Sequence, residues 1–259
     1  MTRGGCEVDR VHRALAEAIA AERLRIVATL IRTTGDWDLA EDAVADAAER
    51  ALRRWSVDGI PDNPAAWLTT TARRRAIDLL RRRGAESTKL SEVVMDDEPA
   101  ASAHPIDDDR LRLIFACCHP ALSMEARVGL TLNVVAHLSL AAVGRMFLTS
   151  ENTMGQRLLR AKRKIANAGI PYRVPPVDEL PERLDGVLAV IYLVFTEGYA
   201  AAADDDVAAE AIRLGRLLVE LLPDSDEVRA LLALMLLQHA RRAARVVDGE
   251  LVTLEEQDR

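Results

Sequence analysis

The sequence predicts an all-α protein with two small helical domains, an acidic linker between them and a further helical domain at the C-terminus. Aromatic residues make up only 3% of the 259 residues, while Ala, Leu and Arg dominate, a composition that favours helices over sheets. Apolar residues recur at helical spacing over most of the chain. Short segments rich in Gly, Pro and Asp separate these stretches, as turns and linkers do.

Composition also excludes some classes of protein. Apolar residues make up 49% of the chain and the mean hydropathy is near zero, which is typical of a soluble globular protein. No stretch approaches the roughly 18 uncharged apolar residues of a membrane span, and residues 1–9 lack the apolar core of a signal peptide. The three cysteines, with Cys117 beside Cys118, cannot form a disulfide framework. We therefore expect a protein of the reducing cytoplasm.

The first domain, residues 1–84, is expected to hold helices over residues 8–33, 38–55 and 64–83. At the start of the second helix, Asp38 precedes Glu41 by three residues, which is the spacing of a capping box. Asn63 and Pro64 predict the N-cap and the first residue of the third helix. Residues 85–107 have no periodicity and contain acidic clusters with Ser and Pro, which indicates an acidic linker.

The second domain, residues 108–170, is expected to contain helices over residues 110–118, 121–136, 139–147 and 151–168. A C-terminal extension, residues 177–259, carries apolar helix patterns near residues 179–199, 206–222 and 226–245. Charge separates these segments. Residues 111–176 have 9 basic and 2 acidic residues, a net charge of +7, whereas the extension has 8 and 18, a net charge of −10. The first value is typical of a DNA-binding module, although the whole chain carries −7.

The segment 138–164 predicts a helix-turn-helix. One stripe of its second helix is apolar and is expected to pack on the first helix; it consists of Met154, Leu158, Ala161 and Ile165. The opposite side is polar and basic. Because a recognition helix contacts base edges near its N-terminus, Thr153 and Gln156 are candidates for base contacts. The candidates for phosphate contacts are Arg157, Arg160, Arg163 and Lys164. The alternative is an ordinary amphipathic helix with a solvated basic face.

The helix predicted over residues 64–83 has a second basic face, since its last eleven residues include six arginines. Such a density predicts phosphate binding. The preceding loop, residues 56–63, together with Trp67 at the start of the helix, is suited to hold an unstacked base. The alternative for Trp55 and Trp67 is that both are core aromatics.

These segments, in this order, resemble bacterial sigma factors of the extracytoplasmic-function (ECF) group of the sigma-70 family. The resemblance covers residues 1–168 and rests on three stretches, which are DWDLAEDAVADAAERALRRW (36–55), NPAAWLTTTARRRAIDLLRRR (63–83) and TMGQRLLRAKRK (153–164). The stretches DRLRLIFACCHPAL (109–122) and IPYRVPPVDELPERL with YLVFTEGY (170–199) resemble the branch that carries a C-terminal helical, TPR-like extension.

The resemblance implies a transcription initiation factor that is not an enzyme and needs no cofactor or metal. Its partners would be core RNA polymerase, contacted at the β′ clamp helices and the β flap, and promoter DNA. No membrane partner is expected. The residues implied for the β′ clamp helices are Asp38, Glu41, Asp42 and Asp46. Those implied for the −10 element are Asn63, Arg73, Arg74, Arg75, Asp78, Arg81 and Arg82. The helix over 151–164 would read the −35 element, and the acidic linker would lie in the RNA exit path.

The chain departs from the family pattern at several of these positions. Ala45 and Ala48 stand where Gln and an aromatic residue are frequent, and Arg74 stands where Asn is frequent beside the captured base. Leu148 and Asn152 replace the usual turn glycines, so we expect a turn of a different shape.

The extension is expected to regulate the protein by docking, because its charge is opposite to that of residues 111–176. Two other functions are compatible with parts of the sequence. One is a polymerase-independent helix-turn-helix regulator with a ligand-sensing C-terminal domain. The other is an all-α enzyme with its site near Glu197 and Tyr199, among the aromatic residues of 192–199, for which core packing is the simpler role. Adjacent thiols on a helix point apart, so Cys117, Cys118 and His119 are expected to be structural.

Overall fold

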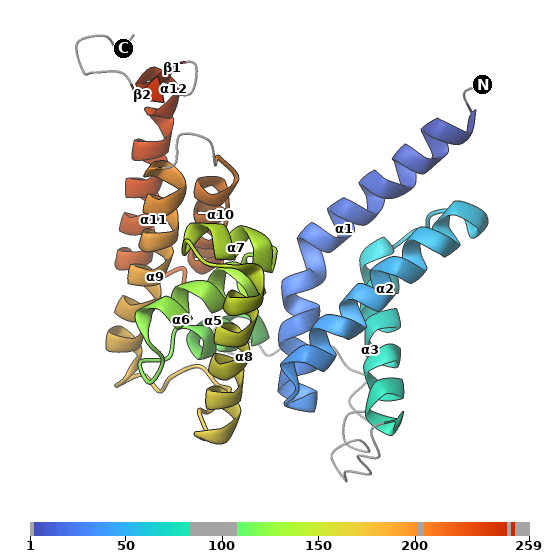
Figure 1. Ribbon diagram of the computed structural model, residues 1–259, viewed down its shortest axis with the longest axis horizontal. Helices are drawn as coiled ribbons and strands as arrows, with labels where there is room; N and C mark the ends of the chain where they lie inside the picture. The colour runs from blue at the N-terminus through green and yellow to red at the C-terminus, as the bar shows by residue number, and fades with distance from the viewer. Residues whose placement is uncertain (1–2, 83–107, 201–204, 248–249, 252–259) are drawn as a thin grey trace. The chain divides into compact units, whose positions relative to one another are not determined.

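The computed structural model describes residues 3–82, 108–200, 205–247 and 250–251 (Figure 1). The chain divides into two compact units, Met1–Ala101 and Ser102–Arg259, which we call the N-terminal and C-terminal units and describe separately. The predicted all-α class is confirmed. The described residues include one small exception to the predicted class, an antiparallel hairpin of β1 (Val246–Val247) and β2 (Glu250–Leu251).

The N-terminal unit packs α1 (Arg3–Thr34), α2 (Trp37–Asp58) and α3 (Pro64–Arg82) against one another. The side of α2 that faces the core consists largely of buried alanines, which let the three helix axes approach closely; they are Ala40, Ala43, Ala47 and Ala51. Leu68 and Ala72 of α3 and Val27 and Ile31 of α1 complete this core. The apolar spacing that predicted these helices therefore corresponds to one shared interior.

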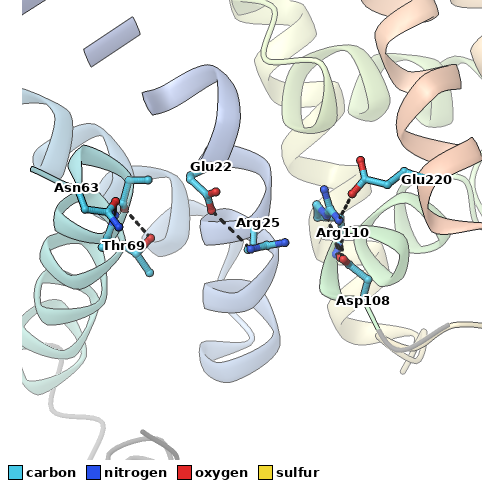
Figure 2. A network of polar contacts seen from close by, with 9 residues as sticks. Glu22, Arg25, Asn63, Thr69, Asp108, Arg110 and Glu220 are labelled. Atoms are coloured by element: carbon cyan, nitrogen blue, oxygen red, sulfur yellow. Dashed lines mark hydrogen bonds and ion pairs between the residues drawn. The ribbon is translucent and has the colours of Figure 1, made fainter. Parts of the chain in front are cut away.

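Two helix starts in this unit test the predicted caps. The prediction for α3 is confirmed, because the Asn63 side-chain oxygen accepts a hydrogen bond of 3.0 Å from the Ala66 N–H, one turn into the helix (Figure 2). The prediction for α2 is wrong. Asp36, not Asp38, is the N-cap, and its carboxylate accepts from the Leu39 N–H at 2.9 Å. Asp38 lies in the first helical turn, where its charge favours the positive end of the helix dipole.

The first part of the C-terminal unit contains α5 (Asp109–Cys117), α6 (Met124–Leu130), the π-helix η2 (Thr131–Val135), α7 (Leu140–Met146) and α8 (Glu151–Asn167). Serine hydroxyls cap three of these helices, and the caps are Ser123, Ser139 and Ser150. The helix expected from residue 121 begins only at Met124 and changes to π geometry at Thr131. The expected acidic linker, residues 85–107, lies outside the described residues, and Asp108 is the N-cap of α5.

The extension forms α9 (Leu180–Ala200), α10 (Asp205–Leu221), α11 (Asp226–Ala240) and α12 (Arg242–Arg245). The pattern expected over 226–245 is thus interrupted after Ala240. None of the helices that the structure describes has the length and apolar character needed to cross a bilayer.

Helix α5 lies between the two parts of the C-terminal unit. Six of its nine residues are buried, namely Leu111, Leu113, Ile114, Phe115, Ala116 and Cys117. They cover more than one side of the helix, and a helix that is apolar on several sides requires partners on each. It contacts η2 and α9, and α9 contributes the fully buried Val187 and Ile191. Residues 108–168 and the extension therefore share one hydrophobic core.

Candidate nucleic-acid interface

A pocket of about 490 Å³ opens between α2 and α3 in the N-terminal unit. Its lining is made by Arg50, Arg53, Arg54, Trp67, Thr71 and Arg74. Four guanidinium groups beside one indole combine the two features that bind single-stranded nucleic acid, positive charge for phosphates and an aromatic surface for bases. Arg74 was expected to bind DNA from the sequence, whereas the three arginines of α2 were not. Their signal is the i, i+3, i+4 spacing of Arg50, Arg53 and Arg54, which places them on one side of α2, next to its buried alanines.

The two tryptophans of this region have different environments. Trp55 is a core residue, with 2% of its surface exposed. Trp67 is only partly buried, and it lines the pocket. Their rings meet edge to face, with centroids 5.5 Å apart and an interplanar angle of 71°. Trp55 therefore fixes the indole of Trp67 from the core side.

The other residues expected at the −10 element differ in how free they are to bind DNA. Arg74, Arg81 and Arg82 are exposed, while Arg73 and Asp78 are partly buried. Asn63 is exposed, but its side-chain oxygen caps α3. Arg75 is partly buried and donates a hydrogen bond from Nε to Asp46 of α2.

The four carboxylates of α2 expected to bind polymerase fall into two pairs. Asp38 and Asp42 are exposed. Glu41 and Asp46 are partly buried, and each interacts with an arginine of the same unit. Burial lowers the pKa of Arg23 in α1, and the charge of Glu41 opposes that shift. Two of the four carboxylates thus have an arginine partner within the unit.

Helix α8 has the two sides that its sequence predicts. The stripe of Met154, Leu158, Ala161 and Ile165 is buried, and α8 packs on α6 and α7. The exposed side, which we call the reading face, carries Gln156, Arg157, Arg160, Arg163 and Lys164. Thr153 is partly buried, and its hydroxyl lies 2.9 Å from that of Ser150. Gln156 is therefore the better placed of the two residues expected to contact bases.

Some groups on the reading face have partners within the unit. The ammonium group of Lys164 donates a hydrogen bond of 2.6 Å to the Ala121 carbonyl oxygen. Arg157 lies 4.0 Å from Glu125 of α6, an exposed and weak ion pair. Arg160 donates from Nε to the Gln156 carbonyl oxygen in its own helix at 3.3 Å.

The turn between α7 and α8 is tight. Leu148 has φ of 50°, the left-handed region that glycine adopts without strain. Gly144 approaches the turn so closely that a Cβ there would lie 3.0 Å from the Thr149 carbonyl oxygen. The Thr149 N–H also donates to the Gly144 carbonyl oxygen at 2.9 Å.

Cys117 and Cys118 are buried, as expected. The Cys118 sulfur lies 3.6 Å from the Thr131 hydroxyl, and burial raises the pKa of this thiol to about 11. Among the described residues, no cluster of three His, Cys, Asp or Glu side chains is arranged to hold a metal ion.

Of the aromatic residues of α9 whose side chains the structure describes, one is a core residue and the other packs on it. Phe195 is fully buried, and Tyr192 stacks on it with ring centroids 6.5 Å apart. Glu197 is exposed, and the side chain of Tyr199 lies outside the described residues.

Polar contacts join α5 to the extension. Arg110 donates from Nη2 to Asp108 at 2.8 Å and to Glu220 of α10 at 3.1 Å (Figure 2). Arg183 of α9 donates to the Phe115 carbonyl oxygen at 3.0 Å. These contacts lie around the shared core and leave the reading face of α8 exposed.

Comparison with known proteins links both units to described families. Residues 18–86 match Sigma-70 region 2, and residues 183–259 match a family of unknown function, DUF6596. An uncharacterized protein of Rhizobium meliloti (strain 1021) is 41% identical over 256 residues, which cover 93% of this chain and 60% of that protein. A probable ECF RNA polymerase sigma factor, SigI of Mycobacterium tuberculosis, is 26% identical over 172 residues, or 64% of this chain and 59% of that protein.

The chain thus spans about 60% of the length of these relatives. No solved structure gives a significant match. The fold and the region 2 match define an all-α protein whose N-terminal unit is a sigma region 2. Within this chain the match to the sigma-70 family covers region 2, and the chain is similar to a probable ECF sigma factor.

Proposed function

We propose that the chain is an ECF-type alternative sigma factor, which binds core RNA polymerase and directs promoter-specific transcription initiation. The observation that carries the proposal is the basic, aromatic pocket between α2 and α3, because it lies within the segment that matches Sigma-70 region 2. A protein that only binds duplex DNA has no need for such a site.

The pocket supports a function in opening the −10 element. An unstacked base would stack on Trp67, and the surrounding arginines would neutralise the neighbouring phosphates. The exposed Arg74, Arg81 and Arg82 on α3 would extend this basic surface along the strand.

The reading face of α8 supports docking on the −35 duplex. Gln156 would contact a base edge in the major groove, and Arg160 and Arg163 would bind phosphates on either side. The exposed carboxylates Asp38 and Asp42 of α2 would bind basic groups of the β′ clamp helices.

We further propose that the extension regulates initiation without covering the reading face. It packs on α5 and α6, whereas Arg160 and Arg163 on α8 stay exposed. Regulation would therefore act through the stability or position of α8, or through the access of polymerase, including its β flap, to the C-terminal unit.

Co-elution of the full chain with bacterial core RNA polymerase, at low and high salt, tests the proposal. We expect a stable complex that is weakened in the double variant Asp38→Asn and Asp42→Asn. The matched control is the double variant Asp9→Asn and Glu17→Gln, which removes the same charge from exposed positions of α1. No co-elution of any form, with duplex DNA still bound, would instead indicate the polymerase-independent regulator.

A further inference from the structure

Asp46 and Arg75 form an ion pair between α2 and α3. The Nε–H of Arg75 donates to Oδ2 of Asp46, 29 residues earlier in the chain. The Arg75 side chain is 19% exposed and that of Asp46 is 33% exposed. The pair is thus partly shielded from solvent.

The pair lies at the edge of the pocket. Arg75 directly follows Arg74 and is one helical turn beyond Thr71, and both of these residues line the pocket. Asp46 is one turn before Arg50, which also lines it. A guanidinium released from Asp46 would therefore lie next to the residues that line the pocket.

The same carboxylate lies on the acidic stripe of α2. Asp38, Asp42 and Asp46 follow one another at intervals of four residues, so they share one side of the helix. A basic partner that binds the exposed Asp38 and Asp42 has Asp46 as its next carboxylate. Because a partly exposed ion pair contributes little stability, a competing cation can replace Arg75.

We propose that Asp46 is an autoinhibitory latch, which holds Arg75 away from single-stranded DNA until a basic partner on α2 takes over the carboxylate. The proposal rests on the proposed function, with core RNA polymerase as that partner. Polymerase binding to α2 and capture of the −10 strand by α3 would then be coupled through one ion pair.

Fluorescence anisotropy of the full chain without polymerase tests the latch, with a labelled dT12 oligonucleotide as the probe. We expect Asp46→Asn to tighten dT12 binding about 3- to 10-fold. The slope of log K against log salt concentration should become steeper by about 0.7, the value of one further phosphate contact to a single strand. Asp42→Asn removes the same charge from the same helix and releases no arginine, so we expect a change below about 2-fold.

A double-mutant cycle separates the latch from a purely structural link between the helices. We expect Arg75→Gln to abolish the increase in dT12 affinity that Asp46→Asn causes. In the wild-type background, where Asp46 holds Arg75, the same substitution should weaken dT12 binding less. Equal effects of Arg75→Gln in both backgrounds would overturn the latch. Equal gains in Asp42→Asn and Asp46→Asn would do the same, because they would reflect charge alone.

Trp67→Ala distinguishes failure of the latch from failure of the proposed function. If the wild-type chain binds dT12 and loses binding in Trp67→Ala, while Asp46→Asn binds as the wild type does, only the latch fails. If dT12 binds to none of the forms, the single-strand site fails and the latch fails with it.

Discussion

Arg183, in the first helix of the extension, makes two contacts with Phe115 of α5. Its Nη2 group donates a 3.0 Å hydrogen bond to the Phe115 carbonyl oxygen, and its guanidinium lies over the Phe115 ring, 6.0 Å from the centroid. The first contact satisfies a buried backbone acceptor and the second adds a cation–π attraction. Arg183 is the first residue of the segment that matches DUF6596. This one side chain therefore links that segment to α5.

We expect Arg183→Met to lower the free energy of unfolding of the C-terminal unit by about 1–3 kcal/mol, since it leaves the Phe115 carbonyl without its charged donor. All three tryptophans are in the N-terminal unit. In a urea titration of the full chain, the circular dichroism transition should therefore shift while the tryptophan fluorescence transition does not.

Arg216 provides the matched control for this variant, because it is an exposed arginine of α10. Arg216→Met should change the free energy of unfolding by less than about 0.5 kcal/mol. Equal effects of the two substitutions would show that Arg183 contributes only its charge.

The turn between α7 and α8 gives the second prediction. Gly144→Ala would bring a Cβ to 3.0 Å from the Thr149 carbonyl oxygen, which is backbone and cannot swing aside. We expect a loss of about 1–3 kcal/mol in the free energy of unfolding of the C-terminal unit. Gly155→Ala in α8 is the control, since its Cβ would meet only the Leu140 side chain at 3.6 Å. A helical Gly-to-Ala change in open space gains up to about 1 kcal/mol, so the two variants should differ in sign.

Most helices could be predicted from the sequence because their signals are local. The Asn63–Pro64 start of α3 and the apolar stripe of α8 depend only on neighbours within a few turns. The N-cap of α2 was misassigned for a local reason as well. Asp36 and Asp38 are both competent caps, and only the backbone conformation selects Asp36.

The rest of the site depends on tertiary packing. Arg50, Arg53 and Arg54 join Arg74 only because α2 packs along α3, and nothing local in the sequence pairs Asp46 with Arg75. The change from α6 to η2 at Thr131 has no sequence signal that we recognise. The burial of α5 on several sides is visible in its apolar run, but its partner on one side, α9, begins about 60 residues later.

The third prediction concerns pH. Burial and the positive charges of Arg183 and Arg127 lower the pKa of His119, while Glu179 opposes them. Nδ1 of His119 accepts a hydrogen bond of 3.1 Å from the Ala121 N–H, which requires an unprotonated Nδ1. Below the unfolded-state pKa of about 6.5, the unfolded chain therefore binds more protons than the folded chain. Stability is fully present above pH 6.5 and declines as the pH falls towards the folded-state pKa.

Urea titrations between pH 5 and pH 8, followed by circular dichroism, measure this dependence. We expect the free energy of unfolding of His119→Gln to fall less steeply below pH 6.5 than that of the wild type. The difference should be modest because the imidazole is partly exposed. His12→Gln, which removes a histidine from an exposed position of α1, is the control substitution. Parallel curves for the wild type and His119→Gln would contradict the prediction.

The fourth prediction separates the two kinds of contact expected from the reading face of α8. Arg160→Ala and Arg163→Ala should each weaken binding to all duplexes alike. Each should also reduce the slope of log K against log salt concentration by about 0.9, the value of one phosphate contact. Gln156→Ala should leave the salt dependence unchanged. Gln156→Ala should weaken the binding free energy for the preferred duplex by about 1–3 kcal/mol and that for other duplexes by less. The reason is that a base contact distinguishes sequences and a phosphate contact does not.

Enrichment of duplexes from a randomised library identifies the preferred sequence, and anisotropy at several salt concentrations gives the slopes. Arg173→Ala is the control, because Arg173 is exposed and lies beyond the end of α8. An amphipathic helix with a merely solvated basic face predicts a different result. In that case Arg173→Ala would lower the slope as much as Arg160→Ala, and Gln156→Ala would not change which sequences are enriched.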